Sequence, residues 1–267
     1  MQLGHVSVAS IIGMGVSVII SIGLPVFLML FLKFKAKAKV NFFFIGAAIF
    51  VVFALMLEQC CHLAVLGLTG DVIQKNLWLY ALYAGLAAAV FEETGRLVAM
   101  KFFMNRRKVK MDNTNAFMYG IGHGGAESIL LVGITCINNL TTSIMLNSGQ
   151  LEASLNALDT ETKNQAIAGI QQLVELPALS FYMAGLERIF AIIIQIALSI
   201  IMYQAVKYGK KKLILLAYVA HFLVDAITVI ATQFLNMIAV ECLIASMTGA
   251  VGVCAYMIWQ KYEKGEE

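Results

Sequence analysis

Seven long apolar runs divide the chain, and they constrain its fold more than any other feature of the sequence. A helix that crosses the hydrocarbon core of a bilayer needs about 20 consecutive, mostly apolar residues, and each run is at least that long. The runs are continuous rather than alternating between polar and apolar residues, which excludes a membrane β-barrel. They lie at Val6–Leu32, Asn41–Leu66, Leu77–Met100, Asn115–Ile137, Pro177–Val206, Leu213–Thr232 and Met237–Gln260.

Composition narrows the class of protein further. Hydrophobic residues make up 60% of the 267 residues and charged residues only 13%, against about 25% charged residues in a typical soluble domain. A soluble enzyme, a nucleic-acid-binding protein and a disordered protein are thereby excluded. We therefore expect an all-α, polytopic membrane protein with about seven transmembrane helices, in which residues 1–267 form a single transmembrane domain.

The basic residues predict the orientation of these helices. Fifteen lysines and arginines (four, five, four and two) follow the first, third, fifth and seventh runs, whereas the alternate connections hold only Lys75 and Lys163. Because loops rich in lysine and arginine stay in the cytoplasm, we expect the N-terminus outside and the C-terminus in the cytoplasm. Residues 138–176 then form an external loop. The apolar spacing in its second half predicts a short amphipathic helix, capped by Asp159 or Thr160.

Several ionisable residues lie inside the apolar runs, where each is a functional hypothesis because its burial in lipid is costly. Glu92 and Glu93 precede Lys101 by nine and eight residues, and His123 follows Asn115 by eight. His221 lies nine residues after the basic segment that ends at Lys212. At 1.5 Å per residue, all four lie about 12–14 Å deep from the cytoplasmic side. Three helices therefore place two carboxylates and two imidazoles in one layer.

The ionisable residues also form pairs four residues apart, which share a helix face. We expect Arg96 to keep Glu92 ionised or to neutralise a developing charge. We expect Glu127 and Asp225, one turn deeper, to accept the second ring N–H of each histidine and fix its tautomer. The alternative is that each pair only holds helices together. The pairs are Glu92 with Arg96, His123 with Glu127, and His221 with Asp225.

Glycines flank His123, and two interpretations of them stay open. The spacing Gly120-x-x-x-Gly124 is typical of closely packed membrane helices. The same glycines would also let the backbone of a substrate approach the histidine.

A second polar layer is predicted in the outer half of the membrane. Glu58, Arg188 and Glu241 each lie 19 residues from the cytoplasmic end of their run, a depth of about 28 Å. One interpretation is a structural ion cluster, in which Arg188 compensates Glu58, Glu187 and Glu241. The other is a path for water or ions. His62 lies still further out and is not grouped with the inner histidines.

Carboxylates and histidines at one depth suit the activation of water. A glutamate or a bound metal deprotonates the water, while a histidine or arginine stabilises the oxyanion. Zinc is one alternative, with His123, His221, Glu92 and Glu127 as candidate ligands and Glu93 as a substitute for Glu92. Direct activation by the glutamate is the other. The motifs H-E-x-x-H and G-x-S-x-G are absent, and Asp225 is the only aspartate in the runs, which excludes an aspartyl dyad.

The motifs resemble those of a known superfamily. Glu92-Glu93-Thr94-Gly95-Arg96 is similar to the first motif of the CAAX-protease and PrsW-like intramembrane proteases, and Tyr119-x-x-x-His123 to the second. His221-Phe-Leu-Val-Asp225 matches a further H-x-x-x-[ND] motif. The residues of these segments, together with Gly-His-Gly-Gly-Ala-Glu and Leu-Glu-Arg-Ile-Phe, resemble most those of the YhfC-type membrane proteins, a branch of that superfamily. The chain departs from the pattern at Gln195, where a histidine would be expected.

The resemblance implies a fold of packed transmembrane helices and a set of roles. It implies Glu92 or Glu93 as general base for water and His123 as partner of the water or a metal. It implies His221 with Asp225 at the oxyanion or the metal, beside Arg96.

We therefore expect an intramembrane endopeptidase of the bacterial plasma membrane that cleaves membrane-associated peptides or proteins near the cytoplasmic leaflet. It would contact the lipid bilayer and bind no nucleic acid. A non-catalytic scaffold or immunity protein is the first alternative. An ion or proton carrier is less favoured, because the sequence shows no internal repeat.

Overall fold

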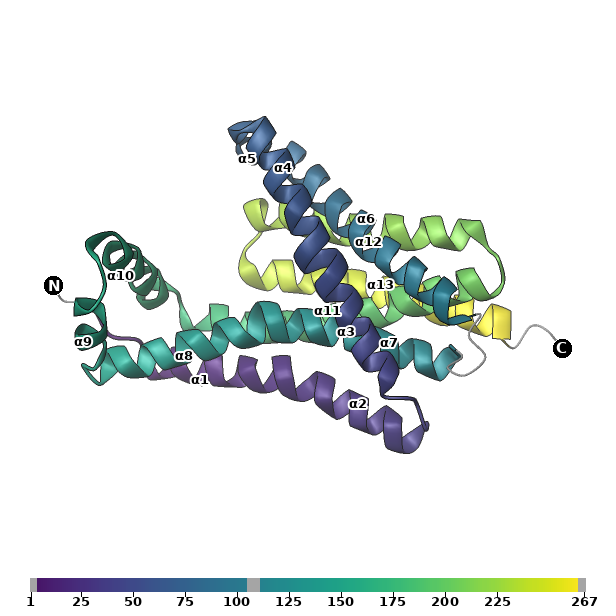
Figure 1. Ribbon diagram of the computed structural model, residues 1–267, viewed down its shortest axis with the longest axis horizontal. Helices are drawn as coiled ribbons and strands as arrows, with labels where there is room; N and C mark the ends of the chain where they lie inside the picture. The colour runs from purple at the N-terminus through teal and green to yellow at the C-terminus, as the bar shows by residue number, and fades with distance from the viewer. Residues whose placement is uncertain (1–3, 105–110, 264–267) are drawn as a thin grey trace. The chain divides into compact units, whose positions relative to one another are not determined.

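The computed structural model describes residues 4–104 and 111–263, and the part of the second basic segment at 105–110 lies outside them. Every regular element among the described residues is a helix, either α or the wider π form, here labelled η. The predicted all-α fold is confirmed (Figure 1). In chain order the elements are α1 (Val8–Val18), η1 (Ile19–Gly23), α2 (Leu24–Lys35), α3 (Asn41–Phe50), η2 (Val51–Glu58), α4 (Gln59–Thr69), α5 (Asp71–Lys75), α6 (Leu77–Met104), α7 (Asn113–Glu127), η3 (Ser128–Gly133), α8 (Ile134–Asn147), α9 (Leu151–Asn156), α10 (Thr160–Glu175), α11 (Ala178–Lys207), α12 (Lys211–Phe234) and α13 (Met237–Glu263).

Six helices within the described part of the chain are long and apolar enough to cross a membrane. Three of them are composite, because α1, η1 and α2 are continuous, as are α3, η2 and α4, and α7, η3 and α8. Helices α11, α12 and α13 are the other three. Helix α6 has 28 residues but carries Glu92, Glu93 and Arg96 in its second half, and it is not among the six. A multi-pass membrane protein is indicated, while the seventh span and the orientation stay predictions.

The amphipathic helix expected in the second half of 138–176 is present as α10. The Asp159 carboxylate caps it by accepting hydrogen bonds from the backbone N–H groups of Glu161 and Thr162, each at 3.0 Å. Its buried face packs on the short helix α9, where Ile170 meets Leu151 and other apolar residues. The helix is therefore held both by its cap and by its apolar side.

One predicted boundary was wrong. The fourth apolar run does not end at Ile137, because α8 continues to Asn147. The polar residues of this extension remain in the helix by bonding the turn before them: the hydroxyls of Thr141 and Ser143 donate to the carbonyls of Ile137 and Asn139, at 2.9 and 2.7 Å. Serine and threonine commonly satisfy their hydroxyls in this way inside helices.

The chain divides into two compact units, and the helices α2 and α11 and the junction of α7 with η3 pass from one to the other. The smaller unit contains the residues up to Leu24 together with Ser128–Ile189. Its helices meet at small residues: the Ser17 hydroxyl donates to the carbonyl of Phe181, and a Cβ on Gly185 would lie 2.6 Å from the Ser17 oxygen. Contacts of this kind replace the hydrophobic effect in holding membrane helices together.

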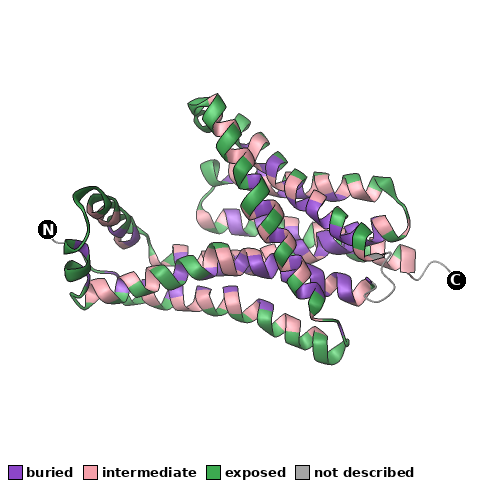
Figure 2. Cartoon of the chain, viewed as in Figure 1, coloured by how far each residue is buried: buried purple, intermediate pink, exposed green. Residues whose placement is uncertain are grey.

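The larger unit, Pro25–Glu127 with the residues from Phe190 on, is built around α7. Nearly the whole of this helix is buried (Figure 2). Helix α3 crosses it so closely that a Cβ on Gly122 would lie 1.9 Å from the carbonyl oxygen of Phe43. On another side, a Cβ on Gly120 would lie 2.7 Å from the Cα of Ile196 on α11. The glycines therefore serve close helix packing, the first of the two interpretations left open by the sequence.

Replacing Gly122 with alanine tests this packing. The added methyl group has no room against the Phe43 backbone, so we expect the free energy of unfolding to fall by about 1–3 kcal/mol. Gly249→Ala on α13 is the matched control, since nothing lies within 4 Å of a Cβ there. Thermal unfolding in detergent micelles measures both. Equal melting temperatures for the two variants would contradict the role given to Gly122.

Candidate active site

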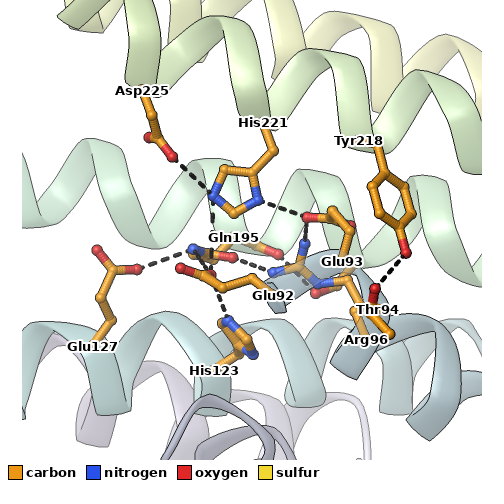
Figure 3. A network of polar contacts seen from close by, with 11 residues as sticks. Glu92, Glu93, Thr94, Arg96, His123, Glu127, Gln195, Tyr218, His221 and Asp225 are labelled. Carbon is orange, nitrogen blue, oxygen red and sulfur yellow. Dashed lines mark hydrogen bonds and ion pairs between the residues drawn. The ribbon is translucent and has the colours of Figure 1, made fainter. Parts of the chain in front are cut away.

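Four helices of the larger unit bring the predicted site residues together (Figure 3). All six predicted catalytic residues and the tentative metal ligand Glu127 lie in one network of polar contacts. The structure thus joins residues that are up to 133 positions apart in the sequence, from Glu92 to Asp225. The contributing side chains are Glu92, Glu93 and Arg96 of α6, His123 and Glu127 of α7, Gln195 of α11, and His221 and Asp225 of α12.

The carboxylate of Glu92 lies at the centre of this network. Its Oε2 accepts a hydrogen bond from Nε2 of His123 at 2.9 Å and another from Nε2 of Gln195 at 2.9 Å. Nε2 of His221 lies 4.0 Å from the same oxygen. The two imidazoles therefore approach one carboxylate oxygen from opposite helices, α7 and α12.

The partner of Arg96 differs from the prediction. Its guanidinium pairs with Glu93, three residues before it, rather than with Glu92, and it also donates to Oε1 of Gln195. Glu92 already accepts hydrogen bonds from His123 and Gln195, and the guanidinium donates to Glu93 instead. Arg96 and Glu93 have no exposed surface, and a buried ion pair of this kind needs its further hydrogen bonds.

Glu93, which is fixed by Arg96, also binds His221. Its Oε1 accepts a hydrogen bond from Nδ1 of His221 at 2.8 Å. The proton on Nδ1 is assigned from this partner, since a carboxylate oxygen cannot donate. In the neutral imidazole, Nε2 then carries the lone pair, and it faces Oδ2 of Asp225 at 3.4 Å and Glu92 at 4.0 Å. These electron-rich atoms repel one another unless a proton or a cation lies among them.

Glu127 does not accept a hydrogen bond from the second ring nitrogen of His123, which the sequence analysis predicted. Nδ1 of His123 has no hydrogen-bond partner among the described residues. Glu127 instead accepts a hydrogen bond from Nε2 of Gln195 at 3.0 Å. The imidazole of His123 packs against the rings of Phe50 and Tyr119, whose centres lie 5.4 and 6.0 Å from its own.

Gln195 belongs to the network, although the sequence analysis noted it only as a departure from the motif pattern and gave it no role. Because a guanidinium can only donate, the Gln195 carbonyl oxygen must face Arg96, and its NH₂ group must face the carboxylates of Glu92 and Glu127. One amide thus joins the cation to two carboxylates. The available signal was an uncharged polar residue within the apolar run of α11, at the position where a histidine was expected.

The cluster is closed on one side and open on another. Arg96, Glu93 and His123 are completely buried, whereas 34% of the Asp225 side chain is exposed. Four carboxyl groups face a single guanidinium in this space. Since uncompensated buried charge is strongly destabilising, the cluster requires protons or a cation.

These residues fit a zinc ion in donor type and in charge. Imidazole nitrogens and carboxylate oxygens are zinc ligands, and a dication would offset the excess of carboxylates. His221 also has the carboxylate partner on its second nitrogen that metal-bound histidines usually have. No three histidine, cysteine, aspartate or glutamate side chains among the described residues already form a metal-binding group. Binding would therefore require the His123–Glu92 hydrogen bond to open.

The predicted outer layer is divided between the two units. Glu58 and Glu241 are buried in the larger unit, where Nε2 of the partly exposed His62 lies 3.3 Å from Oε1 of Glu58. Arg188 belongs to the smaller unit, where it pairs with the adjacent Glu187.

Comparison with known proteins places the chain in a family. A family model described as "YhfC intramembrane metalloprotease" matches residues 20–245, which include every residue of the cluster. The chain belongs to the YhfC family. The "Uncharacterized membrane protein YhfC" of Bacillus subtilis (strain 168) is 37% identical over 220 residues, which cover 79% of this chain and 83% of that protein. No solved structure gives a significant match.

Membership confirms the resemblance found in the motifs. The family's description supports a membrane protease that uses a metal, while the Bacillus relative is uncharacterised. This YhfC chain carries, in one buried network, the charged residues of all three motifs.

Replacing Gln195 with leucine tests the bridge that it forms. The substitution leaves Arg96 and two carboxylates without the amide, so we expect the free energy of unfolding to fall by about 1–3 kcal/mol. Ile193→Leu, at a half-exposed position of the same helix, is the control and should change little. Thermal unfolding in detergent compares them. A Gln195→Leu protein as stable as the control would show that the amide is dispensable.

Proposed function

We propose that this chain is an intramembrane endopeptidase that hydrolyses peptide bonds of membrane-associated substrates in the cytoplasmic half of the bilayer. The observation that carries the proposal is the approach of two imidazoles to the Glu92 carboxylate of α6. The imidazoles belong to His123 and His221, whose helices are long and apolar enough to span a membrane. The family description supports the same reaction class.

Glu92 is the proposed general base. Its Oε2 is oriented by Gln195 and His123, and among the contacts drawn in Figure 3 neither a lysine nor an arginine pairs with it. A carboxylate held this way can take a proton from a water molecule as the water attacks the peptide carbonyl. Glu93, by contrast, is committed to Arg96 and His221. We therefore assign Glu93 to positioning and Glu92 to proton transfer.

The hydrogen bonds from Arg96 to Glu93 and from His221 to Glu93 fix the orientation of the His221 ring. With Nδ1–H bonded to Glu93, its Nε2 is presented to the space beside Glu92 and Asp225. This nitrogen binds a metal as the neutral imidazole, or donates to an oxyanion when protonated. Asp225, on the same helix face one turn away, stabilises the protonated form or orients the ring.

Zinc is the cofactor that we propose. His123 and His221, with one carboxylate of Glu92 or Glu127, would hold it, and we favour Glu127 because Glu92 then remains the base. His123 would leave Glu92 to bind the metal, and Gln195 would continue to orient the Glu92 carboxylate. Zinc bound there would polarise the substrate carbonyl and lower the pKa of water. The protein's own contribution is to fix the imidazoles, to supply the base and to keep the surroundings dry.

Replacing Glu92 with glutamine tests the proposed reaction. The amide keeps the shape but cannot accept a proton, so we expect cleavage to fall by about 10²–10⁴-fold. N-terminal peptide profiling of membranes that contain either protein detects cleavage even when the substrate is unidentified. Glu152→Gln, on the exposed face of α9, is the control. If no new N-terminus in these membranes depends on Glu92, the protease function fails and a scaffold function is favoured.

Metal content tests the cofactor separately. We expect purified protein to hold about one zinc ion per chain, and the double variant His123→Ala/His221→Ala to hold none, because catalytic zinc takes three protein ligands. His62→Ala removes an imidazole from outside the cluster and should keep the zinc. Elemental analysis by mass spectrometry measures all three. Cleavage that persists after exhaustive chelation would support direct activation of water by Glu92.

A further inference from the structure

Hydrolysis consumes one water molecule per peptide bond, and the cluster that would perform it is buried. Glu93, Arg96 and His123 have no exposed surface, and Glu92 is only 7% exposed. The Asp225 side chain is 34% exposed, but protein surface at this depth of a membrane would contact lipid rather than water. The site therefore needs a hydrated connection to bulk water. The following inference rests on the proposed function and deepens it by identifying this connection.

Three polar side chains of the larger unit form a line that the proposed mechanism does not use. Nδ1 of His62 and the hydroxyl of Tyr83 are 2.7 Å apart, and Nε2 of His62 lies 3.3 Å from Oε1 of Glu58. Glu58 and His62 are four residues apart and share a helix face, while Tyr83 comes from α6. The line therefore joins the two helices that flank it, η2–α4 and α6.

Exposure changes along this line. Tyr83 and His62 are partly exposed, with 23% of the His62 side chain accessible, whereas Glu58 is buried. Tyr83 is also close to the beginning of α6, at Leu77. The end of the line at Tyr83 and His62 thus reaches the protein surface, and the end at Glu58 is enclosed by protein.

The end at Glu58 faces the candidate active site. Helix η2 packs along α6, since a Cβ on Gly95 would lie 2.7 Å from the ring of Phe53. The two helices run in opposite directions, with His62 beside Tyr83 and Phe53 beside Gly95. Glu58 therefore lies at a level between Tyr83 and Gly95, as Glu92 does. Glu58 is the last residue of η2, and π-helical turns are frequent at functional sites because the extra residue redirects the side chains that follow. Along α6, Tyr83 and Glu92 are nine residues apart, or about 13–14 Å. A few water molecules, together with Glu58, would be enough to span that interval.

We propose that Tyr83, His62 and Glu58 line a water route that supplies the Glu92 cluster from the end of the helices opposite the basic segments. Water enters beside Tyr83 and His62, passes Glu58 and reaches Glu92 and Asp225. The three side chains keep the route hydrated by offering hydrogen bonds in otherwise apolar surroundings. The peptide substrate is not required to use this route.

Two adjacent native cysteines provide a reporter and its control. Cys61 directly precedes His62, is half-buried and lies near Tyr83, so its thiol is beside the route. Cys60 is exposed on a different face of α4. Maleimides react with the thiolate, which forms in water and not in lipid. Labelling therefore distinguishes a hydrated route from lipid-facing surface.

The first experiment labels two variants that retain a single cysteine, Cys61 or Cys60, the other four being replaced by alanine. N-ethylmaleimide is applied to membranes that contain the full-length protein. We expect Cys61 to be labelled and Cys60 to be protected. Absence of labelling at Cys61 overturns the route, and so does equal labelling of both, because the whole turn would then lie in bulk water.

The second experiment measures cleavage after obstruction of the route. Attaching a bulky maleimide to Cys61 should cause a loss of kcat with KM unchanged, because substrate binding does not depend on the route, while the Cys60 protein should be unaffected. Glu58→Leu should lose kcat in the same way and Glu58→Gln should retain it, since an amide also binds water. Full activity of Glu58→Leu and of the blocked Cys61 protein overturns the proposal.

The two experiments separate this inference from the proposed function. Selective labelling of Cys61 in a protein without any cleavage supports the water route and contradicts the protease. Cleavage that depends on Glu92 in a protein whose Cys61 is unlabelled supports the protease and contradicts the route.

Discussion

The burial of ionisable groups in an apolar helical protein is the constraint on which the rest of this structure depends. Each such group is costly inside a membrane unless other groups complete its hydrogen bonds. Arg96 of α6 donates hydrogen bonds to Glu93 and to Gln195 of α11. Glu93 in turn accepts a hydrogen bond from His221 of α12. The requirement for partners therefore fixes the relative position of three helices, and the same contacts orient the groups proposed for catalysis.

Close packing makes this network possible. His123 reaches Glu92 from α7, a helix whose glycines allow α3 and α11 to approach to backbone contact. A larger residue at Gly122 or Gly120 would clash with the backbone of α3 or α11, so these helices would have to move apart. The glycines thus contribute to the site without touching a substrate. The rings of Phe50 and Tyr119 then close the space around His123.

The positions of the site residues were largely predictable, whereas their pairings were not. Depth along each helix follows from residue spacing alone, and it correctly grouped Glu92, His123 and His221. The prediction that Arg96 pairs with Glu92 was wrong. Helical spacing permits a pair with Glu93 equally well, and Glu92 already accepts a hydrogen bond from Gln195. Gln195 was noted only as a departure from the motifs and was given no role, because an uncharged residue does not stand out by its cost in a membrane. Its contacts are visible only when α11 is placed against α6.

The sequence by itself determined the helical membrane fold, the family and the layer in which the ionisable residues lie, because hydropathy, motifs and helical rise are properties of a single segment. Only the tertiary structure decided which partners each group takes. Side chains on different helices meet according to helix rotation and packing distance, which residue spacing does not specify. Those two quantities place Glu92 between two imidazoles, commit Glu93 to Arg96, and set Glu58 at a level between Tyr83 and Gly95, as they do Glu92.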